Sequence, residues 1–133
     1  MRFPVIIQTR QTEHLKGLFI MKWTCIACCL ILALLFFGIG WVSRHMQQPT
    51  WFFALGHTKD RYPASDFTDI SAFNHANSLM WFFSAALFFL LGVASFFFND
   101  LLALELMTIL ILLQLPISFL IYRALVKRYR KNS

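Results

Sequence analysis

The sequence has few charged residues: Asp, Glu, Lys and Arg make up 14% of its 133 residues, while 59% are hydrophobic. This balance excludes a soluble domain, because the core of a 133-residue soluble domain cannot bury so much apolar surface. The sequence also lacks a nucleophile elbow, a phosphate-binding glycine loop and a dinucleotide-binding fingerprint. An enzyme is therefore the least favoured class, and no cofactor is expected.

Long apolar runs are present instead, at residues 23–42, 79–98 and 101–122. About 20 helical residues cross the hydrocarbon core of a bilayer. Only Asn99 and Asp100 separate the last two runs, so a tight outer turn (99–100) is expected between them. The first run exceeds the apolar region of a signal peptide and has no small-residue cleavage site, so it is a retained span. The predicted fold class is all-α integral membrane, with three transmembrane helices.

The basic residues flank these spans and indicate an orientation. Four Lys and Arg residues precede the first span, three lie in the loop 43–78, and five lie in the tail 123–133. Because cytoplasmic segments carry the excess of Lys and Arg, we expect this loop and the tail in the cytoplasm and the N-terminus outside a plasma membrane. The expected partner of the basic tail is a bilayer with anionic headgroups, and nucleic acid is not expected.

Residues 1–22 form an N-terminal arm before the first span. Met1–Ile20 has no clear helical stripe, and we predict it to be the least structured part of the chain. The arm carries the basic residues that oppose the proposed orientation. Met21 is therefore a candidate for the true initiator, and the alternative is an arm outside the membrane.

Small residues recur at helical spacing in the first two spans. These residues are Cys25, Cys29, Ala33 and Gly40 in the first span, and Ala85, Gly92 and Ser95 in the second. Small side chains let membrane helices approach closely, so we predict that these are packing faces. The aromatic residues of the second span are expected to face lipid, and Trp23, Trp41 and Trp81 to lie in interfacial belts.

Cys25, Cys28 and Cys29 form a cluster within the first span. No His or carboxylate lies near them in the sequence to complete a metal shell, so we interpret them as reduced, small apolar residues. A metal or redox role and palmitoylation are the alternatives. No metal site is predicted.

The loop 43–78 has an aromatic part, 49–56, which is too short to cross a bilayer and is expected to lie at the membrane interface or to re-enter the membrane. After it, we predict a short interfacial amphipathic helix over about 66–78, with Ser65 as its cap and Asp69 in its first turn. Asn74 and Asn77 lie one helical turn apart near its end and are expected to anchor it, with ligand binding as the alternative. The loop also holds acidic and histidine residues that lack a compact zinc spacing: His57, Asp60, Asp66, Asp69 and His75.

Glu105 is the only carboxylate at membrane depth. An ionisable group inside a bilayer is often functional, so one interpretation couples it to protons or cations. The other is that it reaches headgroup water, because it lies only about 7 Å along the helix from Asp100. Gln114 and Ser118 fall on roughly the opposite side of the helix, which weakens a channel interpretation.

The segment from Pro49 to Trp81 carries the strongest family-like pattern. It is formed by Phe53, Ala54, Gly56, Thr68, Asp69, Ile70, Ala72, Phe73, Asn74, Ala76, Asn77, Met80 and Trp81. This pattern resembles uncharacterised small three-span membrane proteins of Gram-positive bacteria, which are loosely similar to bacteriocin-immunity-type membrane proteins. The resemblance implies a bacterial plasma membrane and transfers no active site.

The expected function is therefore helix-helix interaction by a small polytopic membrane protein, as an immunity, regulatory or accessory subunit. Its partner would be another membrane protein or a second copy of the chain. The alternative is a subunit of an oligomeric transporter or channel that uses Glu105. A membrane enzyme that uses the loop carboxylates and histidines is the third possibility.

Overall fold

The computed structural model describes residues 3–50, 52 and 63–131. In this part of the chain it has three α-helices: α1 (Phe3–His45), α2 (Ile70–Ala94) and α3 (Asp100–Tyr129). A short 3₁₀ turn, η1 (Ala64–Asp66), precedes α2. All three α-helices are long and apolar enough to cross a membrane, which fits a multi-pass membrane protein.

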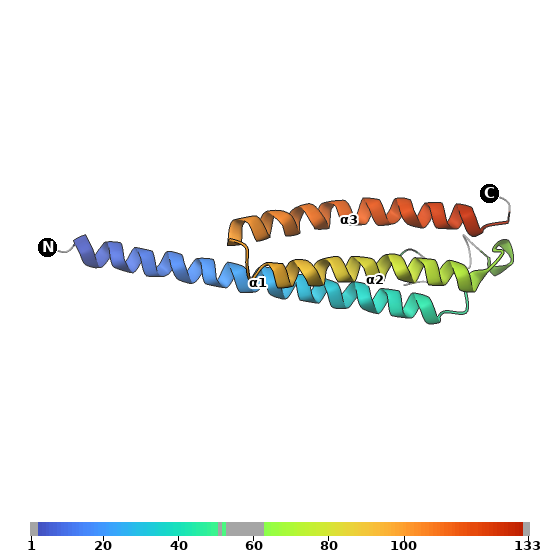
Figure 1. Ribbon diagram of the computed structural model, residues 1–133, viewed down its shortest axis with the longest axis horizontal. Coiled ribbons are helices and arrows are strands. Elements are labelled where there is room, and N and C mark those ends of the chain that lie inside the picture. Colours follow the sequence, from blue (N-terminus) through green and yellow to red (C-terminus); the bar gives the residue numbers. More distant parts are fainter. Residues whose placement is uncertain (1–2, 51, 53–62, 132–133) are drawn as a thin grey trace.

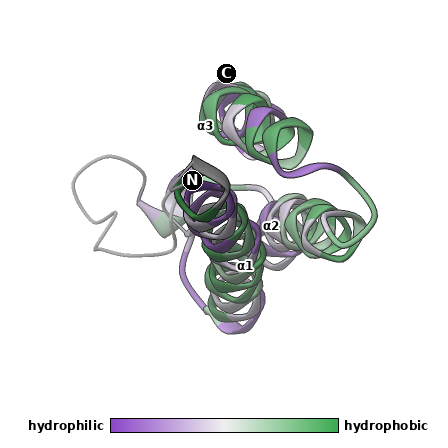
Figure 2. Cartoon of the chain, turned by 90° about the vertical axis from the view of Figure 1, so that its left-hand side faces the viewer, coloured by the Kyte–Doolittle hydropathy of each residue, from purple (hydrophilic) through white to green (hydrophobic). Residues whose placement is uncertain are grey.

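The three helices lie side by side with alternating direction (Figure 1). Viewed along the bundle, they occupy the corners of a triangle (Figure 2). The α1–α2 connection and the C-terminus lie at one end, which we call the loop end. The short connection between α2 and α3 lies at the other, which we call the turn end. The first part of α1 continues past the turn end as a single helix.

The prediction that Met1–Ile20 is the least structured segment is wrong, because α1 runs without a break from Phe3 to His45 and this projecting part belongs to it. Pro4 lies in the first turn, where a residue without an N–H breaks no intrahelical hydrogen bond. The whole helix is about 65 Å long, about twice the thickness of a bilayer's hydrocarbon core. The predicted span 23–42 is its second half. We call residues 3–21 the helical arm.

The start of α2 differs from the prediction of a separate helix over 66–78. A 3₁₀ turn ends at Asp66, and α2 then runs from Ile70 to Ala94 without interruption. Its N-cap is Asp69, whose Oδ1 accepts a hydrogen bond from the Ala72 N–H at 3.0 Å. Asp69, and not Ser65, therefore sets where the helix begins, and the residues predicted to be interfacial form the first turns of a span.

The turn end is also longer than the predicted turn at 99–100. Residues 95–99 make the connection, and Asn99 caps α3 by accepting a hydrogen bond from the Leu102 N–H at 2.8 Å. At the other end, α3 extends into the predicted basic tail, 123–133, and ends at Tyr129. It continues through Pro116, so the predicted span 101–122 is the larger part of one 30-residue helix.

The core lies toward the loop end and is built largely from aromatic rings. The Trp81 ring packs on Phe36 and Phe52, with centroid distances of 5.4 and 5.3 Å. Phe88 is also fully buried. The expectation that the aromatic residues of the second predicted span, 79–98, face lipid is therefore wrong for Trp81 and Phe88, whereas Phe83, Phe89, Phe96, Phe97 and Phe98 are exposed. Trp81 is not an interfacial belt residue.

Candidate functional site

Asn74 is the centre of a buried polar cluster at the loop end. Its Nδ2 donates hydrogen bonds to the backbone oxygens of Met46 and Gln48, at 3.0 and 2.8 Å. Its Oδ1 accepts from the Thr50 N–H and hydroxyl, at 3.0 and 3.1 Å. This pattern fixes the amide orientation, because carbonyl oxygens accept only and the Thr50 N–H donates only. One side chain thereby serves three backbone groups of the segment that follows α1.

Asn77 completes the cluster one turn further along α2. Its Nδ2 donates to Ser43 Oγ and Thr50 Oγ1, both at 3.0 Å. The two hydroxyls lie 3.2 Å apart, and all four side chains are buried. We call Ser43, Thr50, Asn74 and Asn77 the polar cluster. Among the described residues, Asn77 Oδ1 has no hydrogen-bond partner.

Two further hydrogen bonds hold the same segment against the bundle. Trp81 Nε1 donates to the Phe52 oxygen, and the Tyr122 hydroxyl of α3 donates to the Thr50 oxygen, both at 3.0 Å. Buried backbone groups outside a helix need such partners, since an unsatisfied group in an apolar environment is costly. The site therefore works as an anchor for irregular backbone: it ties residues 46–50 and Phe52 to α2 and α3.

The C-terminal end of α3 is tied to the segment before α2. The Thr68 N–H and hydroxyl both donate to the Tyr129 oxygen, at 2.9 and 3.1 Å. The Lys131 N–H donates to the Asp66 oxygen at 2.7 Å, and Arg130 pairs with the Asp66 carboxylate at 3.5 Å. Part of the basic tail is thus engaged within the protein.

A second, smaller set of buried polar groups lies midway along the bundle. Gln114 of α3 donates through its Nε2 to Ser84 Oγ of α2 and to Ser118 Oγ, the latter at 2.7 Å. All three side chains are buried. The set joins α2 to α3 at the depth of the spans, where few polar partners exist.

The acidic candidates lie away from both sets. Glu105 is exposed on α3, so it does not face the same side as the buried Gln114 and Ser118. Asp69 is exposed and acts as the cap of α2. In the described part of the chain, no three His, Cys, Asp or Glu side chains converge on a metal position. Two members of the acidic and histidine set considered from the sequence, His57 and Asp60, lie outside the described residues, as does most of the aromatic part 49–56.

The small residues of the first two spans are buried inside the bundle, and two of the glycines bring α1 and α2 close together. Cys25, Cys29, Ala33 and Gly40 are buried on α1, as are Ala85, Gly92 and Ser95 on or directly after α2. The approach is closest at two glycines. A Cβ added to Gly92 would lie 3.2 Å from the Cys29 Cβ, and one added to Gly40 would lie 3.1 Å from the Ser78 oxygen. These contacts set the spacing of the two helices.

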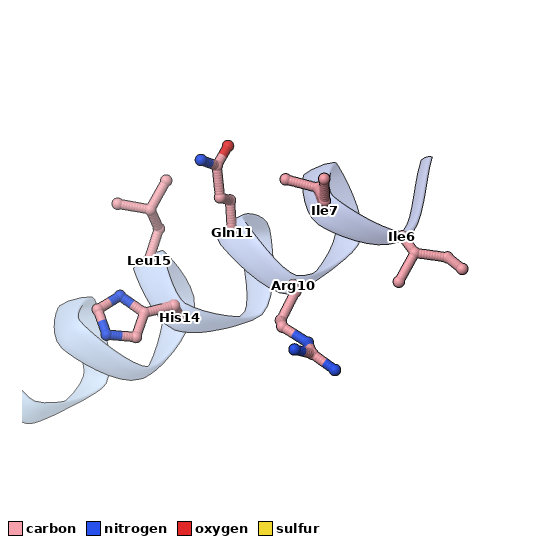
Figure 3. Close-up of a pocket in the computed structure, with 6 residues that line it drawn as sticks. All are labelled: Ile6, Ile7, Arg10, Gln11, His14 and Leu15. Atoms are coloured by element: carbon pink, nitrogen blue, oxygen red, sulfur yellow. The ribbon is translucent and has the colours of Figure 1, made fainter. Parts of the chain in front are cut away.

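The helical arm has a different character from the bundle. Every side chain from Val5 to Ile20 is exposed except Leu18, which is half-buried. Among the described residues, those that line a hollow along the arm all belong to α1, and Figure 3 shows them along this one helix. They include apolar Ile6, Ile7 and Leu15 and basic Arg10. The arm is therefore an open surface, and its hollow is not an enclosed cavity.

Sequence reasoning identified Asn74 and Asn77 but missed their partners. Ser43 and Thr50 lie up to 34 residues away along the chain, and Tyr122 lies 72 residues from Thr50. One signal was available: each of these residues carries a polar group next to or inside an apolar segment, where a buried polar group needs a partner. The pairing itself depends on the tertiary structure.

Comparison with known proteins gives no relative for this arrangement: no protein-family model, no curated protein and no solved structure matches the chain.

Proposed function

We propose that this chain is a non-enzymatic membrane protein that acts by contact with another membrane protein, as an immunity, regulatory or accessory subunit. The observation that carries this proposal is the helical arm. It extends about 28 Å past the last residues of the bundle, and its apolar side chains, such as Ile7 and Leu15, are exposed. In proteins most helical stability comes from the packing of an apolar face, and the side chains of the arm are largely exposed, so a partner surface would stabilise it.

The distribution of polar groups supports the same proposal. The buried amides of Asn74 and Gln114 are engaged in hydrogen bonds that hold the bundle together. The charged and amide groups of the arm, including Arg10, Gln11 and Glu13, are exposed. Mixed apolar and polar side chains on one open helix suit a protein surface, which offers both kinds of contact.

The proposed location is a bacterial plasma membrane, with the arm outside and the loop and C-terminus in the cytoplasm. The distribution of Lys and Arg supports this orientation. The loop end and the C-terminus lie together at one end of the bundle and the arm at the other, as this topology requires. The resemblance of the segment from Pro49 to Trp81 to small proteins of Gram-positive bacteria supports the bacterial location.

Site-specific photo-crosslinking in native membranes tests the proposal. A photoreactive residue at Ile7 or Leu15 should give one discrete adduct with a second protein. The matched control is Leu112, which is 67% exposed on α3, similar to Leu15 at 64%, but lies within a span. Discrete adducts from the arm and none from Leu112 are expected. Absence of adducts from the arm, or the same adducts from all three positions, would contradict a contact role for the arm.

A further inference from the structure

Sulfur atoms from two helices meet near the turn end of the bundle. Cys25 and Cys29 lie one turn apart on α1, and both are buried. They form a cluster with Ala103 of α3, against which Leu91 of α2 and Met107 of α3 pack. Cys25 Sγ lies 3.7 Å from Met107 Sδ. Two thiols and one thioether are therefore held where all three helices meet.

We propose that Cys25, Cys29 and Met107 bind a monovalent soft metal ion, Cu(I) or its analogue Ag(I). Thiolate and thioether ligands select Cu(I), whereas carboxylate and carbonyl ligands suit Mg²⁺, Ca²⁺ and Mn²⁺. Three sulfur ligands that surround an ion in a plane, each about 2.3 Å from it, are about 4 Å apart. The sulfur atoms of Cys25 and Met107, which lie 3.7 Å apart, are already close to this spacing.

The surroundings of the sulfur atoms favour a preformed site. The approach of α2 at Gly92 is so close that an added Cβ would lie 3.2 Å from the Cys29 Cβ. On the side of α3, the small residue Ala103 packs against the two cysteines. Rigid helices that place ligands in advance reduce the ordering that metal binding would otherwise require.

The chemistry of binding balances without a change in oxidation state. Each thiol releases its proton to water and forms a sulfur–metal bond, so Cu⁺ with two thiolates carries one negative charge. Lys22, three residues before Cys25, brings a positive charge to this end of the bundle, where its Nζ donates to the Phe96 oxygen at 3.1 Å. The Trp23 ring also contacts Phe96, so Cys25 lies less than one helical turn inside the turn end.

Titration of Cu(I) against a chromophoric chelator tests the site, with the full chain in lipid nanodiscs under reducing, anaerobic conditions. We expect one Cu(I) per chain. Cys25→Ser and Met107→Leu should each weaken binding roughly tenfold or more, since even an outer-shell partner of a metal ligand contributes that much. Cys28→Ser is the matched control, because Cys28 is a neighbouring thiol outside the cluster.

X-ray absorption at the copper edge provides the second measurement. The wild-type chain should show three sulfur neighbours and the Met107→Leu variant two. Leu has nearly the volume of Met, so this variant keeps the packing and decides the question even if a cysteine variant does not fold. Binding that Met107→Leu leaves unchanged, equal loss in Cys28→Ser, or no stoichiometric Cu(I) would overturn the proposal.

Discussion

The two ends of the bundle are held together by different interactions. At the loop end the chain leaves helical geometry after His45, and the polar cluster supplies hydrogen bonds for the backbone there. At the turn end the connection is short, and small side chains such as Cys29 and Gly92 bring α1 and α2 into direct contact. Polar side chains are thus buried where irregular backbone needs partners, and van der Waals packing serves where helices satisfy their own hydrogen bonds.

The largest effect is expected from Asn74→Ala, which breaks the loop end. It leaves the Met46 and Gln48 oxygens and the Thr50 N–H without their partner. Each unsatisfied buried group costs about 1–3 kcal/mol, so we expect a loss of roughly 3 kcal/mol or more in the free energy of unfolding. Denaturant titration in mixed micelles measures this loss.

The matched control is Asn99→Ala at the turn end, where the same residue type only caps a helix. Loss of that cap should cost about 1 kcal/mol. Hydrogen exchange at the Thr50 amide should accelerate in Asn74→Ala and not in Asn99→Ala. Equal losses of stability in the two variants would remove the distinction between the two ends.

Gly92→Leu breaks the turn end and should have the next largest effect. Its side chain would meet Cys29, so α1 and α2 must separate or shift. Overpacking of this kind costs about 1–3 kcal/mol, measured by the same titration. Gly38→Leu is the control, because nothing lies within 4 Å of a Cβ at that position. A loss of stability in Gly38→Leu as large as in Gly92→Leu would show that helix packing at Gly92 is not the cause.

Tyr122→Phe sharpens the comparison by removing one hydrogen bond from the loop end. The hydroxyl donates to the Thr50 oxygen, and the ring packs on Phe52 and Phe73. The ring contacts remain in the variant, so we expect a loss of about 1 kcal/mol. Tyr129→Phe is the control, because it also keeps its ring contact with Phe73. Its free energy of unfolding should stay within about 0.5 kcal/mol of the wild-type value. A larger loss of stability in Tyr129→Phe than in Tyr122→Phe would contradict a stabilising role for the hydrogen bond from Tyr122 to Thr50.

Glu105→Gln should have the smallest effect. The side chain is exposed on α3 and belongs to neither set of buried polar groups, so stability should change by less than about 0.5 kcal/mol. Cation or proton flux in liposomes should also be the same with and without the substitution. Flux that depends on Glu105 would favour the transporter alternative, in which several copies enclose a path.

The sequence predicts the three spans well because an apolar run of about 20 residues is typical of a helix that crosses a membrane. It predicts the helix ends less well. Both Ser65 and Asp69 suit an N-cap, and the position of α2 is decided by contacts from far along the chain, including the Thr68 hydrogen bonds to Tyr129. The length of α1 was missed because the arm has no amphipathic stripe. One sign of a continuous helix was present: the arm contains a single proline, Pro4, and it lies in the first turn.

The burial of individual residues was harder to predict than the spans. Trp81 and Phe88 are buried while Phe83 and Phe89 are exposed, and lipid is as apolar as a protein core. Hydrophobicity therefore gives no sign of which ring faces inward. Asn74 and Asn77 were recognisable as polar residues at the edge of a span, but their partners come from the last turn of α1 and the segment after it.

Native mass spectrometry of the tagged chain, purified from its own membranes in mild detergent, tests the proposed contact function most directly. We expect a stoichiometric second protein with the wild-type chain. That protein should be lost when Ile7 and Leu15 of the arm are both replaced by Glu, while the bundle remains folded. A monomer alone, or a partner that survives the double substitution, would contradict the role assigned to the arm.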